Sequence, residues 1–310
     1  MTSLEEELAR VKPSGETFLT VGVFDGVHRG HRHLLDLLKR QAARAGCVPG
    51  VVTFRNHPVT VLRPEAPVRL ITTVEERVRL LQELGIETVA PITFTLDVSR
   101  VTAREFVAML QRYLRMCGMV VGPDFALGHN REGTPQVLRG VGTELGFTVA
   151  VASPYDDGGI RVSSTATRNA LAAGDIATAS NLLGRSYALQ GEVVHGEGRG
   201  GSLLGYPTAN VAVDHDLLLP GDGIYATWFH VDSQRYQAAT SIGTRPTFGL
   251  GERTVEAFLL DFRGDLYQKT VRLEFVERLR DEVAFDTAEA LKRQIEIDVR
   301  ETRRVLGAAA

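Results

Sequence analysis

Residues 24–31 read FDGVHRGH and place His28 and His31 three positions apart, beside Gly26 and Gly30. Histidines at this spacing fit three kinds of site: a zinc site, a phosphate cradle and a surface turn. Zinc needs four protein ligands, or three protein ligands and a water. His33 adds a third histidine, but no cysteine joins the set, so the zinc interpretation is disfavoured.

The phosphate interpretation accounts for more of the octapeptide. Glycine lets the backbone approach a ligand closely, and a helix that starts near Gly30 directs its N–H groups and positive dipole end to this place. Imidazoles can donate hydrogen bonds to phosphate oxygens whose charge grows during phosphoryl or nucleotidyl transfer. The first half contains neither a Walker loop nor a GxGxxG sequence. A phosphate site is therefore predicted, with a surface turn as the alternative.

A second candidate site follows the glycine-rich stretch GEGRGGS (196–202), where the sequence continues to PTAN. The Thr208 hydroxyl and the Asn210 carbonyl are hard oxygen ligands two residues apart, so an extended chain projects both to one side. Such a pair suits Mg²⁺, which takes few protein ligands in addition to nucleotide phosphates. The alternative is a turn at the start of a strand.

Glu256 lies in VEAFLLDF, where period-two alternation predicts that it shares a strand face with Phe258, Leu260 and Phe262. A carboxylate on an apolar face is costly unless it is paired, and desolvation favours its protonated form. A carboxylate that takes up a proton more readily in this environment is suited to act as a general base. The alternative is a salt bridge, for example to Arg245.

The elements that must position these residues differ between the two halves. Short apolar strands are predicted at 17–24, 48–54, 88–94, 119–125 and 147–153, with helices between them. Two helices carry capping signals, Thr73 with Glu76 and Thr102 with Glu105. Strands that alternate with helices indicate a Rossmann-like α/β domain with a parallel sheet, which binds ligands beyond the carboxyl ends of its strands.

The pattern becomes strand-rich after about residue 185. Two short helices precede GRSY (184–187), where we place the boundary between domains 1–184 and 185–310. In KTVRLEF, Val271, Leu273 and Phe275 alternate with charged residues, as in a half-buried antiparallel strand. A final long helix is predicted with Asp286 as its N-cap. The second half is predicted to form a small antiparallel β-barrel with a C-terminal helix.

Composition limits the class of protein. The chain has 310 residues, 44% of them hydrophobic and 24% charged, and a formal net charge of −3. This charge gives no footprint for nucleic acid or an anionic membrane. Cys47 and Cys117 are far apart in sequence, which favours a reducing compartment and no disulfide framework. The polar N-terminal stretch is not a signal peptide. We expect a cytoplasmic protein with small-molecule partners, and the sequence allows a homo-oligomer.

Several further stretches accompany the octapeptide in a fixed order. They are GPDFALGHNREG (122–133), RVSSTATR (161–168), GRSYALQGEVVHGEGRGGSLLGYPTAN (184–210), IGTRPTF (242–248), VEAFLLDF (255–262) and LRDE (279–282). Together they resemble the bacterial bifunctional riboflavin kinase/FAD synthetase family over roughly residues 15 to 305. The resemblance implies an α/β nucleotidyltransferase domain followed by a β-barrel kinase domain.

The resemblance also implies roles for particular residues. His28 and His31 match the HxGH pair that contacts the ATP phosphates, Thr208 and Asn210 match the magnesium ligands, and Glu256 matches the catalytic base of the kinase. Further cofactor-binding positions implied are Gly22, Phe24, Gly26, Asp124, Arg161, Ser164, Thr165, Gly196, Gly198, Gly200 and Arg280. Asn56, Ala126 and Leu127 depart from the family pattern near the flavin and adenine loops, where many relatives have Pro, Arg and Phe respectively.

The implied function is a two-step synthesis of flavin cofactors. The barrel phosphorylates riboflavin with Mg–ATP to give FMN, and the first domain joins the AMP of a second ATP to FMN, releasing pyrophosphate and FAD. Two alternatives remain at this stage. In the first, the chain keeps only one of the two activities, the kinase in particular. In the second, the chain is a flavin- or nucleotide-binding regulator without catalysis.

Overall fold

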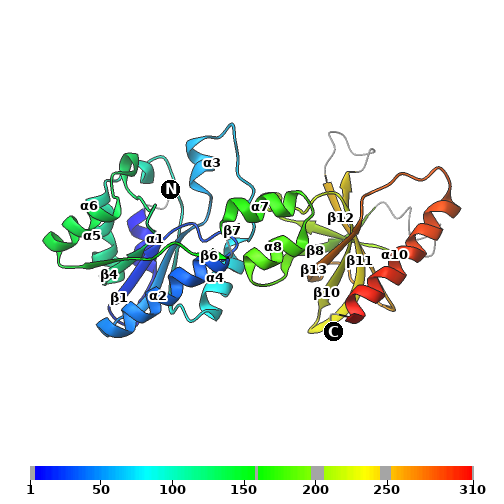
Figure 1. Cartoon of the computed structure of the whole chain (residues 1–310), viewed down its shortest axis with the longest axis horizontal. Helices are drawn as coiled ribbons and strands as arrows, with labels where there is room; N and C mark the ends of the chain where they lie inside the picture. Colours follow the sequence, from blue (N-terminus) through cyan, green and yellow to red (C-terminus); the bar gives the residue numbers. More distant parts are fainter. Residues whose placement is uncertain (1–3, 158–159, 197–205, 245–252, 309–310) are drawn as a thin grey trace. The chain divides into compact units, whose positions relative to one another are not determined.

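The computed structural model describes residues 4–157, 160–196, 206–244 and 253–308 of the chain, and Figure 1 labels its elements. The chain divides into two compact units, Met1–Ser164 and Thr165–Ala310. Each unit has a sheet of its own. The units are therefore described one after the other.

The first unit is built on a five-stranded parallel sheet of order β3-β2-β1-β4-β5, which confirms the α/β class predicted for this half. The strands are β1 (Thr17–Val21), β2 (Val48–Phe54), β3 (Thr88–Ile92), β4 (Met116–Val121) and β5 (Thr148–Val151). The helices are α1 (Leu4–Arg10), α2 (Arg29–Ala45), α3 (Pro58–Leu62), α4 (Val74–Glu83), α5 (Ala103–Leu114) and α6 (Pro135–Leu145), with short 3-10 turns η1 (Val98–Arg100) and η2 (His129–Arg131). The two-residue strands β6 (Asp156–Asp157) and β7 (Ile160–Arg161) pair with each other.

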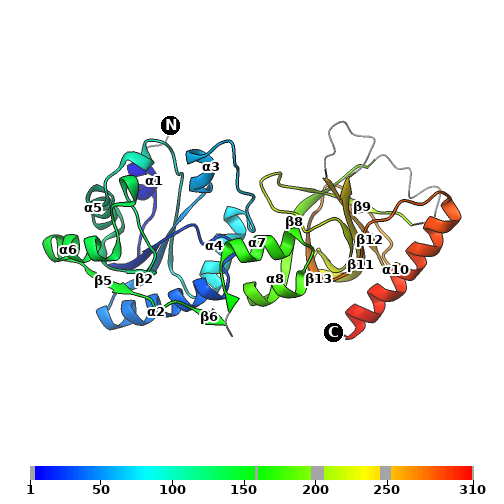
Figure 2. The same ribbon diagram turned by 45° about the horizontal axis from the view of Figure 1, so that its top comes forward.

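Helices cover both faces of this sheet because its strands are apolar on both sides. Leu19 and Val21 of β1 belong to a core with α1, α5 and α6, whereas Phe18 belongs to a second core with α2 and α4. This is the period-two alternation of a strand. Figures 1 and 2 show α5 and α6 on one side of the sheet and α2 on the other. The carboxyl ends of the strands are then the place for a ligand.

The predicted helix starts in this unit are confirmed. The Thr73 hydroxyl accepts a hydrogen bond from the Glu76 N–H, and Thr102 and Glu105 form a complete capping box. Hydrogen bonds from the Thr102 side chain and backbone hold the pKa of Glu105 below its usual value. The strand predicted at 119–125 is shifted, since β4 starts at Met116 and ends at Val121. The GPDF stretch therefore lies in the loop beyond the strand.

The second unit is a closed antiparallel barrel of order β10-β11-β12-β9-β8-β13, as predicted. Its strands are β8 (Tyr187–Val194), β9 (Ala209–Val213), β10 (Gly223–Val231), β11 (Gln234–Thr244), β12 (Arg253–Leu259) and β13 (Thr270–Arg280). Its helices are α7 (Ser164–Ala172), α8 (Ile176–Leu183) and α10 (Ala288–Ala308). Val271, Leu273 and Phe275 are buried in β13, which confirms their predicted alternation.

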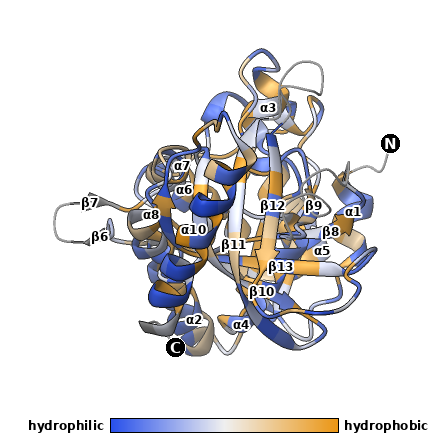
Figure 3. Cartoon of the chain, turned by 90° about the vertical axis from the view of Figure 1, so that its right-hand side faces the viewer, coloured by the Kyte–Doolittle hydropathy of each residue, from blue (hydrophilic) through white to orange (hydrophobic). Residues whose placement is uncertain are grey.

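Helix α10 packs along the barrel. Val305 and Leu306 form an apolar cluster with Ala226 of β10, and Figure 3 shows hydrophilic residues along the same helix. The predicted cap of this helix is wrong by one residue. The Ala290 N–H donates to the Thr287 hydroxyl at 3.2 Å, so Thr287 occupies the capping position that was predicted for Asp286.

The helices before the barrel belong to the second unit by their contacts. Helix α8 contacts β8 and β13 and buries Ile176, Ala179, Leu182 and Leu183. The compact units thus meet at residues 164/165, about one helix pair before the boundary drawn from sequence. Independent folding of residues 185–310 stays a prediction. None of the described helices is long and apolar enough to cross a membrane.

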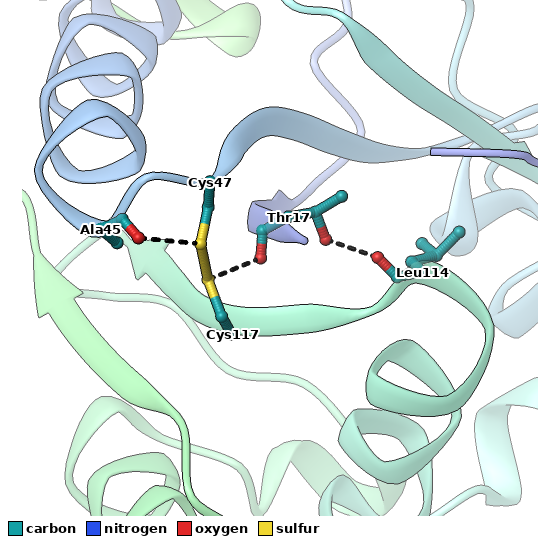
Figure 4. The surroundings of a disulfide bond; sticks show 5 residues. All are labelled: Thr17, Ala45, Cys47, Leu114 and Cys117. Carbon is teal, nitrogen blue, oxygen red and sulfur yellow. Dashed lines mark hydrogen bonds between the residues drawn. A yellow bond between two sulfur atoms is a disulfide. The ribbon is translucent and has the colours of Figure 1, made fainter. Parts of the chain in front are cut away.

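The two cysteines form a disulfide at the amino end of the parallel sheet (Figure 4). Cys47 precedes β2 and Cys117 lies in β4, and β1 runs between these two strands. The carbonyl oxygens of Ala45 and Thr17 lie 3.6 and 3.2 Å from the two sulfurs. The sequence argument for a reducing compartment treated these cysteines as separate, and that premise was wrong. Seventy positions of sequence separation give no local sign of the pairing.

Candidate functional site

The octapeptide forms the turn after the carboxyl end of β1 and, from Arg29 to His31, the first residues of α2. His28 is the N-cap of α2, and its Nδ1 accepts a hydrogen bond from the backbone N–H of His31 at 3.2 Å. The two rings stack with their centroids 3.6 Å apart. Because Nδ1 is an acceptor, the neutral ring of His28 carries its proton on Nε2. The turn therefore combines an imidazole donor with the start of a long helix.

At three positions of this region, steric constraints explain why the residue is glycine. Gly26 has a φ of 80°, a conformation that favours glycine. A Cβ at Gly30 would lie 3.2 Å from the His28 ring, and a Cβ at Gly22 would lie 3.1 Å from the Phe24 ring. The Phe24 ring is buried, with its centroid 4.9 Å from that of His31. These positions let aromatic rings pack tightly around the turn.

Sequence reasoning missed the group that holds the turn in place. Asp25 is 1% exposed, and its carboxylate accepts hydrogen bonds from Ile71 and Thr72. The fully buried guanidinium of Arg77 lies 3.9 Å from the same carboxylate. A signal was present, because Arg77 precedes Leu80 and Leu81 by three and four residues on the buried face of α4.

The RVSST stretch lies beside the octapeptide. The Ser164 hydroxyl donates to the backbone carbonyl of Asp25 at 2.9 Å. Thr165 is exposed in the first turn of α7, and for Arg161 the structure describes the backbone in β7. Ser164 is thus brought to the predicted site. The roles of Arg161 and Thr165 stay predictions.

A cavity of about 690 Å³ opens at the carboxyl end of the sheet. Its lining includes Gly22 after β1, Phe54 at the end of β2, Phe94 after β3, and the 124–131 loop after β4. The Phe54 and Phe94 rings meet edge to face with centroids 5.6 Å apart. Asp124 lies in this lining, so the structure brings it to the same strand ends as Gly22.

Two of the positions that depart from the family pattern also line this cavity, namely Ala126 and Leu127. The third, Asn56, bridges two strand ends. Its Nδ2 donates to the Phe94 carbonyl and its Oδ1 accepts from the Phe94 N–H, both at 2.9 Å. A proline side chain could make neither hydrogen bond. Asn56 therefore holds the cavity wall together.

Thr208, Asn210 and Glu256 meet at two neighbouring strands of the barrel. Asn210 of β9 pairs directly with Glu256 of β12, and the Thr208 hydroxyl donates to Glu256 Oε2 at 3.1 Å. A Cβ at Gly196 would lie 2.2 Å from Asn210 Nδ2, so glycine allows the loop to pass this side chain. Gly198 and Gly200 lie outside the described residues.

Glu256 and Phe258 share a face of β12 as predicted, but the strand ends at Leu259 and the predicted burial of that face is wrong. The buried residues of β12 are Val255, Ala257 and Leu259, whereas Glu256 and Phe258 are partly exposed. Strand alternation therefore puts the Glu256 carboxylate on the face opposite the buried residues. Full burial is not what makes it a candidate base. The alternative salt-bridge partner, Arg245, lies outside the described residues.

A second cavity, of about 470 Å³, lies next to this group and includes Thr208 in its lining. Phe258, Phe262 and Tyr267 contribute aromatic walls, and Asp261 and Asp265 contribute carboxylates. The barrel thus joins a polar group of oxygen atoms to an aromatic recess. That combination can bind a nucleotide, with the aromatic ring system in the recess and the phosphates near the oxygen atoms.

Arg280 forms an ion pair in the described structure. Its Nε and Nη2 donate to the two carboxylate oxygens of Asp298 at 2.8 and 2.7 Å, which ties β13 to α10. A bidentate pair of this kind is geometrically specific. The flavin or phosphate role of Arg280 stays a prediction.

Sequence reasoning also missed a second carboxylate near Glu256. A Cβ at Gly243 would lie 2.1 Å from Glu282 Oε2, so this carboxylate lies directly over the backbone of β11. Burial of the carboxylate, together with the charges of Asp222 and Glu256, raises the pKa of Glu282. The signal was its place in LRDE, two residues after Arg280.

Among the residues that the structure describes, no three histidine, cysteine, aspartate or glutamate side chains gather as a metal-binding cluster. What it does contain are two polar sites beside apolar cavities, one on a doubly wound parallel sheet and one on a barrel. A helix start that can bind phosphate and a largely apolar cavity beside polar side chains are features of sites that bind nucleotides and other small molecules.

Comparison with known proteins makes this class specific. The family model for FAD synthetase matches residues 11–166, and the model for riboflavin kinase matches residues 183–306. The bifunctional riboflavin kinase/FMN adenylyltransferase of Escherichia coli K12 is 36% identical over 298 residues, covering 95% of this chain and 94% of the relative. The enzymes of that description from Pseudomonas fluorescens and Bacillus subtilis are 38% and 32% identical, covering 94% and 93% of this chain and 93% and 92% of theirs.

A solved structure shares the fold. A crystal structure described as a macrolide-efflux protein from Streptococcus pneumoniae has a TM-score of 0.87 and 30% identity, with 96% of both chains covered. Efflux is said of that protein, and this chain shares its architecture.

The chain belongs to the family of bifunctional riboflavin kinase/FMN adenylyltransferases. It phosphorylates riboflavin to FMN and adenylylates FMN to FAD, with ATP as co-substrate. Membership sets aside both earlier alternatives, a single surviving activity and a regulator without catalysis.

Proposed function

We propose that adenylylation of FMN takes place at the octapeptide turn. His28 and His31 bind the triphosphate of ATP, and the protonated Nε2 of His28 donates to a phosphate oxygen. An oxygen of the FMN phosphate attacks the α-phosphorus, and the bond to the β-phosphate breaks to release pyrophosphate. Donors already in place stabilise the charge that grows on the phosphates. The hydrogen bond between His31 N–H and His28 Nδ1 supports this role, since it sets the proton position on His28.

Ser164 supplies a second contact to the phosphates in this proposal, with Arg161 and Thr165 beside it. The hydrogen bond from Ser164 to the Asp25 carbonyl supports its placement at the turn. A hydroxyl and a guanidinium at a helix start form a natural phosphate clamp.

The flavin ring of FMN binds in the cavity of about 690 Å³. Its aromatic walls, among them Phe54 and Phe94, suit a flat apolar ring system. Gly22 and Asp124 face the same space. Ala126 and Leu127 then contact the ring or the nucleotide. Their side chains are smaller than the Arg and Phe of many relatives, which leaves more room in this cavity.

Riboflavin phosphorylation takes place at the barrel, where Thr208 and Asn210 hold Mg²⁺. Their hard oxygen atoms and the adjacent Glu256 carboxylate fit this ion. Bound Mg²⁺ neutralises charge on the phosphates of ATP. Glu256 accepts the proton of the riboflavin 5′-hydroxyl as that oxygen attacks the γ-phosphorus and ADP leaves. The nucleoside of ATP lies in the aromatic recess of about 470 Å³ beside Thr208.

The observation that carries the kinase assignment is the hydrogen bond between Thr208 and Glu256, which joins the metal ligand to the base. The test is an assay with riboflavin and ATP in which riboflavin, FMN and FAD are separated after quenching. Removal of Mg²⁺ by a chelator should abolish FMN formation, and added Mg²⁺ should restore it. Asn210→Ala should raise the Mg²⁺ concentration needed for half-maximal rate, whereas Thr270→Ala, on exposed strand surface, should not. An unchanged Mg²⁺ requirement in Asn210→Ala would contradict the metal site.

The compartment and the partners of the enzyme remain proposals. We infer a cytoplasmic enzyme whose partners are its small-molecule substrates, without nucleic acid. The net charge of −3 and the two cavities support small-molecule partners without nucleic acid, whereas the disulfide between Cys47 and Cys117 argues against a reducing compartment.

A further inference from the structure

Asp25 stands at the centre of a buried polar network under the octapeptide. Its Oδ1 accepts hydrogen bonds from the N–H groups of Ile71 at 2.9 Å and Thr72 at 3.1 Å, and from the Thr72 hydroxyl at 3.3 Å. Its Oδ2 is 3.1 Å from the Ile71 N–H. The side chain of Asp25 is 1% exposed. A carboxylate this deeply buried is tolerated only when its oxygens are satisfied.

Positive charge balances this carboxylate. The guanidinium of Arg77 is completely buried and lies 3.9 Å from Oδ1. It also donates to the Phe54 carbonyl at 2.6 Å and to the Thr72 carbonyl at 3.3 Å. Arg77 therefore links the Asp25 turn to the end of β2 and to the segment that precedes α4.

The backbone of the turn needs such support. Phe24 and Val27 have φ values of 52° and 40°, in the left-handed region that side chains other than glycine rarely occupy. Backbone of this kind persists where the surroundings over-determine it, and it gathers at functional sites. Val27 precedes His28, so any relaxation at Val27 changes the direction of the His28 ring.

Two further hydrogen bonds tie the same turn to its neighbours. The Gly26 N–H donates to the Thr72 hydroxyl at 3.1 Å, and the Ser164 hydroxyl donates to the Asp25 carbonyl at 2.9 Å. The Thr72 hydroxyl thus accepts from Gly26 while it donates to Asp25. Through this hydroxyl the backbone beside the histidines is joined directly to the buried charge.

We propose that Asp25, held by Thr72 and Arg77, is a positioning residue for adenylyl transfer, because it fixes the strained turn that presents His28 and His31 to the triphosphate. The inference rests on the proposed role of these two histidines. Asp25 touches no substrate in this view. Its contribution is to keep the imidazoles aligned, and misplacement by about 1 Å is enough to slow a reaction by roughly 10²-fold.

The sharpest test compares two substitutions of one buried residue. Thr72→Val keeps the shape and removes the hydroxyl, whereas Thr72→Ser keeps the hydroxyl. We expect kcat for FAD formation to fall about tenfold in Thr72→Val, the rate equivalent of a lost hydrogen bond, and to stay near the unsubstituted value in Thr72→Ser. KM for ATP should change less than kcat. The FMN-forming rate of the same molecules, from the barrel, controls for enzyme concentration, and the thermal unfolding curve of each variant controls for folding of the first unit, to which Thr72 belongs.

Asp25→Asn adds a larger perturbation. We expect kcat for FAD formation to fall roughly 10²-fold, with a changed ¹⁵N shift of His28 Nδ1 as the hydrogen bond from His31 weakens. A purely structural role predicts fewer folded molecules with unchanged kcat and an unchanged His28 signal. If Asp25→Asn does not fold, the Thr72 pair still decides.

Equal kcat values in Thr72→Val and Thr72→Ser would overturn the positioning role. His28→Ala, measured in the same series, tests the underlying phosphate role separately. FAD formation at the unsubstituted rate in His28→Ala would overturn the proposed site itself, whatever Thr72 shows.

Discussion

The two proposed phosphate sites hold their candidate side chains by different means. In the α/β unit, His28 and His31 stand on a turn with left-handed residues at Phe24 and Val27, supported by the buried carboxylate of Asp25. In the barrel, Asn210 and Glu256 stand on regular strands, and antiparallel register alone sets them opposite each other. One site depends on a local polar network, and the other depends on the whole sheet.

This difference has a consequence for mutation. A turn that is held by a few hydrogen bonds loses its geometry when one of them is removed. A strand position is set by many ladder hydrogen bonds, so substitution of a neighbour leaves its direction unchanged. We therefore expect supporting residues to matter more in the first site, and contacting residues to dominate in the second.

The largest effect is expected at the barrel. Glu256→Gln keeps the shape but removes the base, so FMN formation should fall by roughly 10²–10⁴-fold. Adenylylation of added FMN should continue. Because Glu256 is partly exposed, the thermal midpoint should change little. The matched control is Glu192→Gln, an exposed carboxylate on β8, which should leave both rates unchanged.

The salt-bridge alternative makes the opposite forecast for Glu256→Gln. Kinase activity per folded molecule would persist while the thermal midpoint falls. Measuring the FMN-forming rate and the midpoint on one sample separates the two. Full activity with a lowered midpoint would leave the barrel without an identified base.

The second effect concerns the histidine turn. His28→Ala or His31→Ala removes a donor to the triphosphate, and loss of such a contact typically lowers the rate by about 10²–10³-fold. FAD formation should collapse while FMN accumulates undiminished. His33→Ala, on the same helix, is the matched control and should keep FAD formation near normal. Because His28 also caps α2, His28→Asn, which keeps an acceptor at the N-cap, should lose FAD formation as His28→Ala does. Recovery in His28→Asn would point to a damaged helix start instead of a lost phosphate contact.

The third effect tests where the barrel unit begins. A fragment of residues 165–310 should fold and form FMN but no FAD. A fragment of residues 185–310 lacks α8, whose Ile176, Leu182 and Leu183 are buried. Burial of one such side chain contributes about 1.5–3 kcal/mol, so loss of the three should make the shorter fragment less stable by about 4.5 kcal/mol or more. Denaturant titration of both fragments measures this, and equal midpoints would support the boundary near residue 184.

The smallest effect on catalysis is expected from the disulfide. Cys47 and Cys117 lie at the amino end of the sheet, whereas both histidines lie beyond the carboxyl end of β1. Closing a loop of about 70 residues stabilises the folded state by about 4 kcal/mol in the chain-entropy model. Reduction should therefore lower the unfolding midpoint of the first unit and leave FAD formation per folded molecule unchanged. A large loss of FAD formation at a temperature where the unit stays folded would show that the two ends of the sheet are coupled.

Local features of the chain could be predicted because they are written in short windows. The capping pairs at Thr73 and Thr102 lie within four residues, and period-two alternation in KTVRLEF identifies a half-buried strand without reference to its neighbours. Family motifs located the histidine turn, Thr208, Asn210 and Glu256 for the same reason. The cap of α10 was predicted one residue too early. Asp286 and Thr287 both offer a side-chain oxygen, and the backbone at the start of α10 selects Thr287.

Sequence by itself determined the order of helices and strands, the α/β and barrel classes, and the chemical types at both sites. Tertiary structure decided the contacts between distant segments. Asp25 meets Ile71 and Thr72 across 46 and 47 residues, the cysteines meet across 70, and Ser164 reaches Asp25 across 139. It also decided which face of β12 is buried, because that depends on the register of β12 with β9 and β11. Periodicity reveals that a strand has two faces, and only the packed neighbours determine which of them meets water.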